Sequence, residues 1–141
     1  MKIQLSIFFI AVSTLFVTAI GQKQEKNYNE LVALIKRGSY FDSSAVFTNG
    51  NKAIAIAEEL KSPSKKAQIY QYFANYHFYS GRMDVAALYY DTSNYIAKSV
   101  NDSSLIVSNE VRKTFIQSIQ DPYNAETKFK ELVRISEKHQ Y

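Results

Sequence analysis

Three stretches of the chain, residues 45–62, 85–102 and 125–140, share one apolar pattern at offsets of 40 and 39 residues. The Ile-Ala pair at 56–57, for example, corresponds to the Ile-Ala pair at 96–97. Self-similarity at a period of roughly 20–50 residues is the signature of a protein built from repeated supersecondary units. Such a unit must bury its apolar face against its neighbours, which excludes most other fold classes.

Each repeated stretch has the spacing of a helix. The second stretch places small or aromatic side chains on one face at three- and four-residue steps, namely Ala86, Tyr90, Ser93 and Ala97. In the third stretch Phe129 corresponds to Tyr90 at the offset of 39. The repeated stretches are therefore predicted to be equivalent helices of successive units.

Partner helices are predicted before and between these stretches, at residues 28–37, 65–80 and 104–119. Each carries apolar side chains at helical spacing, and each is followed by residues that end a helix: Gly38, Gly81 and the pair Asp121-Pro122. Helices joined by short turns run antiparallel to their neighbours. The sequence therefore predicts an all-α fold of six helices in three antiparallel pairs.

Residues 67–100 resemble a tetratricopeptide repeat (TPR). The signature sites of that family fall on Tyr70, Phe73, Ala74 and His77 in the first helix, on Gly81 at the turn, and on Ala86, Tyr90 and Ser93 in the second helix. Small residues at Ala74 and Ala86 suit the point where the two helices cross. The resemblance implies antiparallel helix-pair repeats, about three of them, that form a short right-handed α-solenoid.

The sequence departs from the family pattern at three sites. His77 stands where the family usually has tyrosine, Ser93 where it has alanine, and Lys98 where it has a closing proline. The repeat is also about 40 residues long instead of about 34. A longer repeat of this kind is similar to the extracytoplasmic repeat regions of bacterial sensor and regulator proteins. The resemblance therefore implies a sensory or scaffolding part of a bacterial signalling system.

The N-terminal segment has the layout of a secretory signal peptide. Lys2 supplies a basic start, residues 3–20 are mostly apolar, and small residues follow at Ala19 and Gly21. We expect residues 1–21 to be a signal peptide that precedes a repeat domain at 22–141, and the protein to be periplasmic or extracellular. The alternative is an uncleaved helix at 3–20 that anchors the chain in the inner membrane, since about 18 apolar residues just span a bilayer.

The sequence contains no constellation typical of catalysis or metal binding. Cysteine is absent, and neither His77 nor His139 has a second histidine or a glutamate at metal-ligand spacing. The adjacent carboxylates Glu58 and Glu59 lie among lysines, as on a solvated helix face. We therefore expect no enzyme activity, no metal and no cofactor. We interpret His77 as a core histidine with a hydrogen-bond partner.

The charge of the chain is modest. The formal net charge is +4, and the lysines are scattered among glutamates. Nucleic-acid binding requires cations clustered on one face. We expect no nucleic-acid partner, and contact with a membrane only through an uncleaved leader.

The chain is rich in tyrosine, with eleven in all. We interpret most of them as contacts between helix pairs, with hydroxyl groups at the rim. The TPR resemblance further implies an inner groove, whose sites on the helix at 65–80 fall on Gln68, Gln71, Asn75, Phe78 and Tyr79. Amides pair with an extended backbone whatever its sequence, and a tyrosine adds apolar contact area. The sequence therefore predicts a protein or peptide partner.

Two alternatives remain open from the sequence. The helix at 125–140 is not followed by a polar capping helix, although the open end of a solenoid normally needs one. One interpretation is a structural protein that self-associates, or that is covered by a partner, through this last repeat. The other is a truncated piece of a longer sensor kinase or transcriptional regulator.

Overall fold

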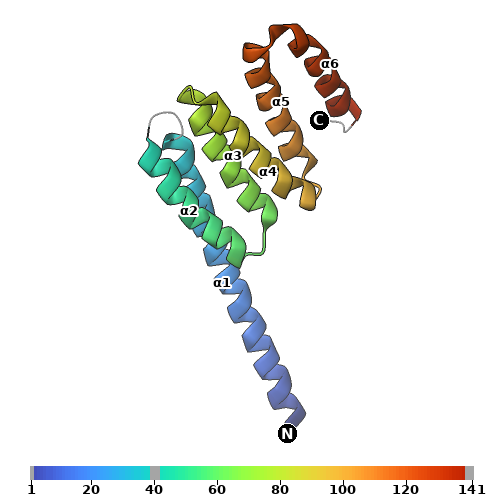
Figure 1. The fold of residues 1–141 in the computed structure, drawn as a ribbon. Coiled ribbons are helices and arrows are strands. Elements are labelled where there is room, and N and C mark those ends of the chain that lie inside the picture. Colours follow the sequence, from blue (N-terminus) through green and yellow to red (C-terminus); the bar gives the residue numbers. More distant parts are fainter. Residues whose placement is uncertain (1, 39–41, 139–141) are drawn as a thin grey trace.

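The computed structural model describes the backbone of residues 2–38 and 42–138, and the side chains of the described residues from 18 onward except those at 120, 125, 135, 136 and 138. Within this part of the chain there are six α-helices and no strand. Consecutive helices pack against each other in adjacent pairs (Figure 1). The helices are α1 (Lys2–Gly38), α2 (Ser43–Glu59), α3 (Pro63–Tyr79), α4 (Met83–Ser99), α5 (Ser103–Gln120) and α6 (Pro122–Lys138). The predicted all-α class is confirmed.

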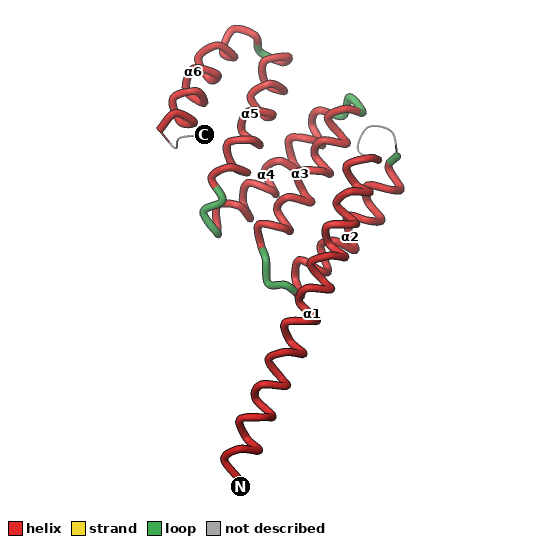
Figure 2. The backbone as a smooth tube through the Cα atoms, turned by 180° about the vertical axis from the view of Figure 1, so that it is seen from behind, coloured by secondary structure: helices red, strands yellow, loops and turns green. Residues whose placement is uncertain are grey.

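The first helix is longer than the helix predicted at residues 28–37. Residues 2–38 form one continuous helix, which at 1.5 Å per residue is roughly 55 Å long. Its C-terminal part packs against α2, and its N-terminal part extends beyond the other helices (Figures 1 and 2). Among the residues whose side chains are described, no helix is long and apolar enough to cross a membrane. Most of the apolar run at 3–20 lies outside those residues.

Three turns between the helices share one geometry. The middle residue of each turn has a positive φ: 51° at Lys61, 76° at Gly81 and 55° at Asn101. In each turn the following N–H reaches back five residues, which is the bond of a Schellman motif. These bonds are Ser62 N to Ala57 O at 2.9 Å, Arg82 N to His77 O at 2.9 Å and Asp102 N to Ala97 O at 3.0 Å. The turns recur every 20 residues, so the chain reverses direction in the same way each time.

The helix starts are fixed by side chains and prolines. Asp42 and Asp102 cap α2 and α5, where their carboxylates accept the N–H groups of Ala45 at 2.9 Å and Leu105 at 3.1 Å. Pro63 and Pro122 are the first residues of α3 and α6, where a missing N–H costs nothing. Together with the turns, these starts place every break between helices at a definite residue.

Two apolar clusters form the described core. The larger joins α1, α2 and α3 through Tyr28, Val32, Ile35, Val46, Ala53, Ala57, Ile69, Tyr72 and Phe73. The smaller joins α3, α4 and α5 through Ala74, Ala86, Tyr90 and Ile116. Close approach explains Gly50 in the middle of α2, because a Cβ there would lie 2.2 Å from Cε1 of Phe73. Ala74 and Ala86 are fully buried, as expected for small residues at a helix crossing.

Candidate binding groove between α3 and α5

Two adjoining cavities lie along the face of α3 that meets α5. The first has a volume of about 330 Å³ and the second about 470 Å³, and Ser108 lines both. The first is bounded by Ser64, Lys65, Gln68, Gln71, Asp102, Ser104, Leu105 and Ser108. The second is bounded by Phe78, Ser108, Val111, Arg112, Phe115 and Phe129. We call the two cavities together the α3–α5 groove.

The amide side chains that line the first cavity are hydrogen-bonded to neighbouring polar groups. The side-chain NH₂ of Gln71 donates to Oγ of Ser108 at 3.0 Å and to Oδ1 of Asn109 at 2.8 Å. Gln68 lies 3.2 Å from the hydroxyl of Tyr28, which also donates to the carbonyl of Lys65 at 2.9 Å. These bonds fix the two glutamines relative to the flanking helices α1 and α5.

The second cavity is apolar and partly open to solvent. Val111 is 41% exposed and Phe115 is 46% exposed. Phe78 and Phe115 both line it, and their rings are tilted by 55° with centroids 5.8 Å apart. Tyr79 is 42% exposed and its ring lies edge-on to Phe78 at 5.3 Å. An open apolar lining of this kind is typical of a contact surface rather than of a folded core.

Asn75 has a structural bond that the sequence did not indicate. Its Oδ1 accepts the hydroxyl proton of Tyr90 at 2.6 Å. Tyr90 is fully buried, and burial raises the pKa of its hydroxyl to about 12. Of the five residues predicted for the groove, Gln68, Gln71 and Phe78 line the cavities, Tyr79 flanks the second, and Asn75 supports the core of the α3–α4 pair.

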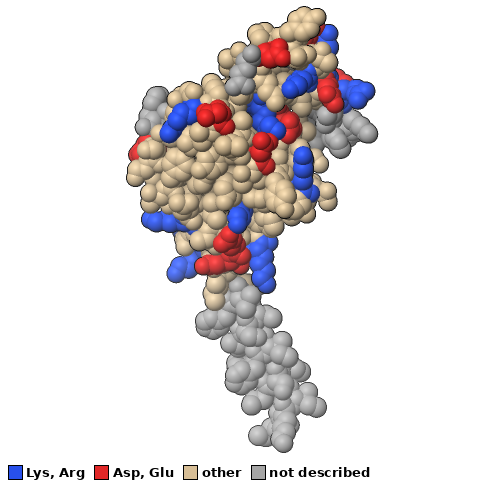
Figure 3. All heavy atoms as spheres, in the orientation of Figure 1, with Lys and Arg blue, Asp and Glu red and all other residues tan. Residues whose placement is uncertain are grey.

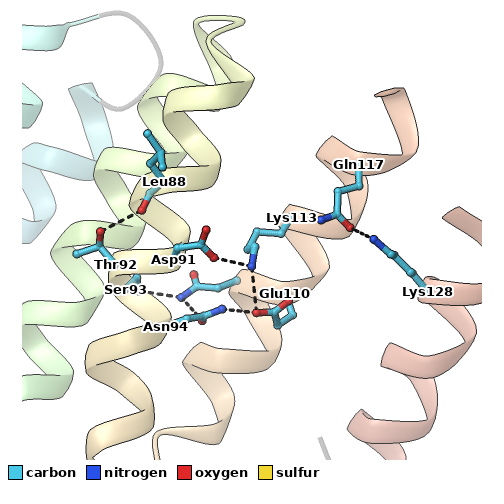
Figure 4. A network of polar contacts seen from close by, with 10 residues as sticks. Leu88, Asp91, Thr92, Ser93, Asn94, Glu110, Lys113, Gln117 and Lys128 are labelled. Carbon is cyan, nitrogen blue, oxygen red and sulfur yellow. Dashed lines mark hydrogen bonds and ion pairs between the residues drawn. The ribbon is translucent and has the colours of Figure 1, made fainter. Parts of the chain in front are cut away.

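A buried polar network lies behind the first cavity, between α3, α4 and α5 (Figure 4). Oγ of Ser93 donates to the carbonyl of Ala67 at 2.8 Å. Nδ2 of Asn109 donates to Oγ of Ser93 at 2.8 Å and to Oδ1 of Asn94 at 2.9 Å. Asn94 in turn donates to Glu110 at 2.5 Å. Sequence reasoning missed this network, although serine at a site usually occupied by alanine was one signal of it.

The network also determines how Gln71 is oriented. The one hydroxyl proton of Ser93 is used by Ala67, so Ser93 can only accept from Asn109. The NH₂ group of Asn109 must therefore point toward Ser93 and its oxygen toward Gln71. Gln71 must then donate to that oxygen through its own NH₂ group. The carbonyl oxygen of Gln71 is left without a bond among the described residues. Gln71, a lining residue of the first cavity, thus has its amide oxygen held in one orientation as an acceptor.

Charged side chains of both signs lie near the groove and elsewhere on the visible surface. Figure 3 shows lysines and arginines interspersed with carboxylates on one face of the molecule. At the first cavity Lys65 pairs with Glu25 at 2.7 Å. On α5, Lys113 pairs with Asp91 at 2.6 Å and Glu110 at 3.5 Å. Burial alone would lower the pKa of Lys113, but the contacts with these two carboxylates raise it.

His77 lies in an aromatic cluster away from the groove. It is 7% exposed, stacks on Tyr89 at 5.2 Å and lies 5.5 Å from the ring of Phe47. Burial chiefly, and then the charge of Arg82, lower its pKa. The predicted core position is confirmed, but Nδ1 is buried without a hydrogen-bond partner among the described residues. The other histidine, His139, lies outside the described residues.

Two further searches, one for metal-binding clusters among the described residues and one for related proteins, gave no additional site or family. In the part of the chain that the structure describes, no three side chains of the metal-binding types gather closely enough to hold an ion. A scan against models of protein families finds no match for this chain, and no curated protein or solved structure matches it either.

Proposed function

We propose that this chain is a non-catalytic, TPR-like helical repeat protein that binds a peptide or an extended segment of a partner protein in the α3–α5 groove. The observation that carries the proposal is the pair of cavities adjoining at Ser108. Three of the five residues predicted for binding, Gln68, Gln71 and Phe78, line them.

The chemistry of the groove suits a peptide. An extended peptide carries unpaired N–H and C=O groups along its backbone and side chains on alternate faces. The amide and hydroxyl groups of the first cavity can pair with the backbone. The exposed ring of Phe115 and the partly buried rings of Phe78 and Phe129 in the second cavity can take an apolar side chain.

The repeated turns support a short right-handed solenoid. The shared geometry at Lys61, Gly81 and Asn101 recurs every 20 residues, so each helix pair follows the last by a similar movement. α3 also contacts both α1 and α5, as expected if the first helices of the three pairs stand in one row. In an α-solenoid such a row of helices forms a concave binding surface.

The sequence features of the leader support export as part of the proposal, with the chain serving as a sensory or scaffolding part of a bacterial signalling system. Mass spectrometry of the protein recovered from the producing cells should find an N-terminus close to Gln22, and fractionation should place it outside the cytoplasm. An intact N-terminus at Met1 in the cytoplasmic fraction would rule out export.

Groove binding is tested with a displayed library of random twelve-residue peptides and two double variants of the full chain. Gln68→Ala with Tyr79→Ala alters the groove and leaves the Asn75–Tyr90 bond intact. Leu88→Ala with Tyr95→Ala alters exposed positions on α4, where the two side chains are 67% and 80% exposed. We expect the wild type and the α4 variant to enrich the same peptides and the groove variant to lose at least about tenfold in enrichment. Equal enrichment by all three would place binding elsewhere, and no enrichment would contradict the proposal.

Self-association is the second candidate function. On α6, Val133 is 54% exposed and Tyr123 is 91% exposed, so this helix offers apolar contact area at the third pair. Sedimentation of the full chain over a hundredfold range of concentration tests it. A stable dimer whose melting temperature rises with concentration, and which enriches no peptide, would favour assembly over peptide binding.

A further inference from the structure

The second cavity contains a cation without a counter-ion. Arg112 lines this cavity, and no carboxylate of the described residues lies within ion-pair distance of its guanidinium. Its neighbour on α5, Lys113, is held by two carboxylates, and Lys65 at the other end of the groove is held by Glu25. Arg112 is therefore the cation of the groove that is left to meet an external anion.

The guanidinium of Arg112 is held in a definite position. It lies over the ring of Phe78, with its central carbon 5.7 Å from the ring centroid. A guanidinium that rests on an aromatic ring is partly desolvated and keeps its N–H fork available for a carboxylate. An anion bound here would have apolar surroundings, with Val111 and Phe115 beside it.

The rest of the groove indicates the backbone conformation of the ligand. The carbonyl oxygen of Gln71 is fixed as an acceptor by the network behind it, one cavity away from Arg112. A helical ligand has already used its backbone N–H groups internally, whereas an extended peptide presents them. In an extended peptide, side chains two positions apart point the same way and lie roughly 6.7 Å apart. Two such side chains can occupy Arg112 and the ring pocket together.

We propose that the α3–α5 groove selects extended peptide segments in which an aspartate or glutamate stands two residues from a large apolar residue. The carboxylate binds Arg112, the apolar side chain enters the second cavity and packs against Phe115 and Phe129, and a backbone N–H donates to Gln71. This inference rests on the proposed function and names the class of sequence that the groove takes. The carboxylate comes from a side chain within the segment, because the first cavity continues the groove beyond Ser108 for the rest of the chain.

The test uses random twelve-residue peptides that are joined to the display coat through their C-termini, so that no free peptide carboxyl terminus is present. They are selected on the full-length wild type, on Arg112→Gln and on Lys98→Gln, which removes an exposed cation of α4 that lines neither cavity. We expect the wild type and Lys98→Gln to enrich peptides with an acid two positions from an apolar residue, and Arg112→Gln to lose that acid. Circular dichroism confirms that each variant keeps its helix content.

Synthetic copies of the best peptide, blocked at both ends, then measure the charge directly. We expect the glutamate-to-glutamine copy to bind the wild type about tenfold more weakly, and both copies to bind Arg112→Gln alike. If wild-type peptides are enriched through Gln68 and Tyr79 but carry no more acids than the library, the groove binds peptides and this inference is wrong. If Arg112→Gln enriches peptides with the acidic residue as strongly as the wild type does, another cation binds the carboxylate and the inference is again wrong. If nothing is enriched, the inference and the proposed function both fail.

Discussion

The two junctions between neighbouring helix pairs are built from different chemistry. At the first junction, where α1 and α2 meet α3, the buried side chains are apolar or aromatic, with Tyr28, Ile35, Ile69 and Phe73 among them. At the second junction, where α3 and α4 meet α5, the chain buries the polar residues Ser93, Asn94 and Asn109. Among the described residues of α5, Ile116 is the one buried apolar side chain.

The two kinds of contact affect different properties: apolar burial mainly stabilises the fold, and hydrogen bonds mainly determine how the helices are oriented. Burying a large apolar side chain contributes about 1.5–3 kcal/mol and makes little demand on direction. A buried hydrogen bond contributes about 1 kcal/mol net, but it forms only when donor and acceptor face each other. The first junction therefore holds the pairs together most strongly. The second junction determines where α5 lies relative to α3, and so the shape of the groove between them.

Removing an aromatic ring from the first junction has the largest expected effect. Phe73 contacts Phe47 and Tyr89 at centroid distances of 4.8 and 5.6 Å and fills the space over Gly50. Phe73→Ala leaves a cavity that the rigid helices cannot close, so we expect the free energy of unfolding to fall by about 3–5 kcal/mol. Urea denaturation followed by circular dichroism measures it.

The matched control for Phe73→Ala is Tyr95→Ala on α4. Tyr95 is 80% exposed, and a surface truncation of this kind changes stability by no more than about 0.5 kcal/mol. Equal losses in the two variants would mean that the first junction is not the main source of stability, and the comparison between junctions would fail.

Breaking the polar network comes next in size. Asn109→Ala removes the partner of Gln71, Ser93 and Asn94 together, and leaves buried polar groups without bonds. We expect a loss of about 2–3 kcal/mol. The loss should be local, because the first junction is untouched. Native-state hydrogen exchange should show that α5 and α6 lose protection while α2 and α3 keep it.

Asn124→Ala is the control for the network. Asn124 is exposed at the start of α6, where its amide donates to the side chain of Asp121 at 2.7 Å. We expect protection in α5 to be unchanged by this variant. If Asn109→Ala lowered protection equally in all helices, the two junctions would unfold as one unit, and orientation and stability could not be assigned to different ends of the molecule.

The helices and their pairing were predictable because they depend on local signals. The apolar period around Ala86 and Tyr90, the glycine at 81 and the proline at 122 all act within a few residues along the chain. The turns at Lys61 and Asn101 were harder to predict. They adopt the same positive φ as Gly81 with side chains that carry a steric cost there, lower for asparagine than for lysine.

The contents of the second junction depend on how helices are placed relative to one another. Asn109 finds Ser93 and Asn94 only when α5 lies against α4 in one register, and the sequence spacing of 16 and 15 residues does not reveal this. Asn75 was assigned to the groove from the TPR resemblance, but its oxygen accepts a hydrogen bond from Tyr90 of the next helix. Gly50 likewise has a reason only once the ring of Phe73 lies against α2. The roles of these three residues depend on tertiary contacts, which the sequence pattern does not reveal.

The smallest expected effect concerns the one buried polar atom without a partner in the described structure, Nδ1 of His77, beside the aromatic side of the first junction. Burial, and then the charge of Arg82, lower its pKa, while Asp84 acts in the opposite direction. The unfolded chain, with a histidine pKa of about 6.5, then binds more protons than the folded chain as the pH falls.

Stability should therefore be constant with respect to His77 above about pH 6.5 and should decline as the pH falls through that value toward the lower folded pKa. In His77→Phe, which keeps a ring stacked on Tyr89, this part of the decline should vanish. Urea denaturation of both proteins between about pH 7.5 and 5.5 measures the difference. Parallel curves would mean that His77 gains a partner for its proton in solution, and the first junction would then tolerate a charge just as the second does at Lys113.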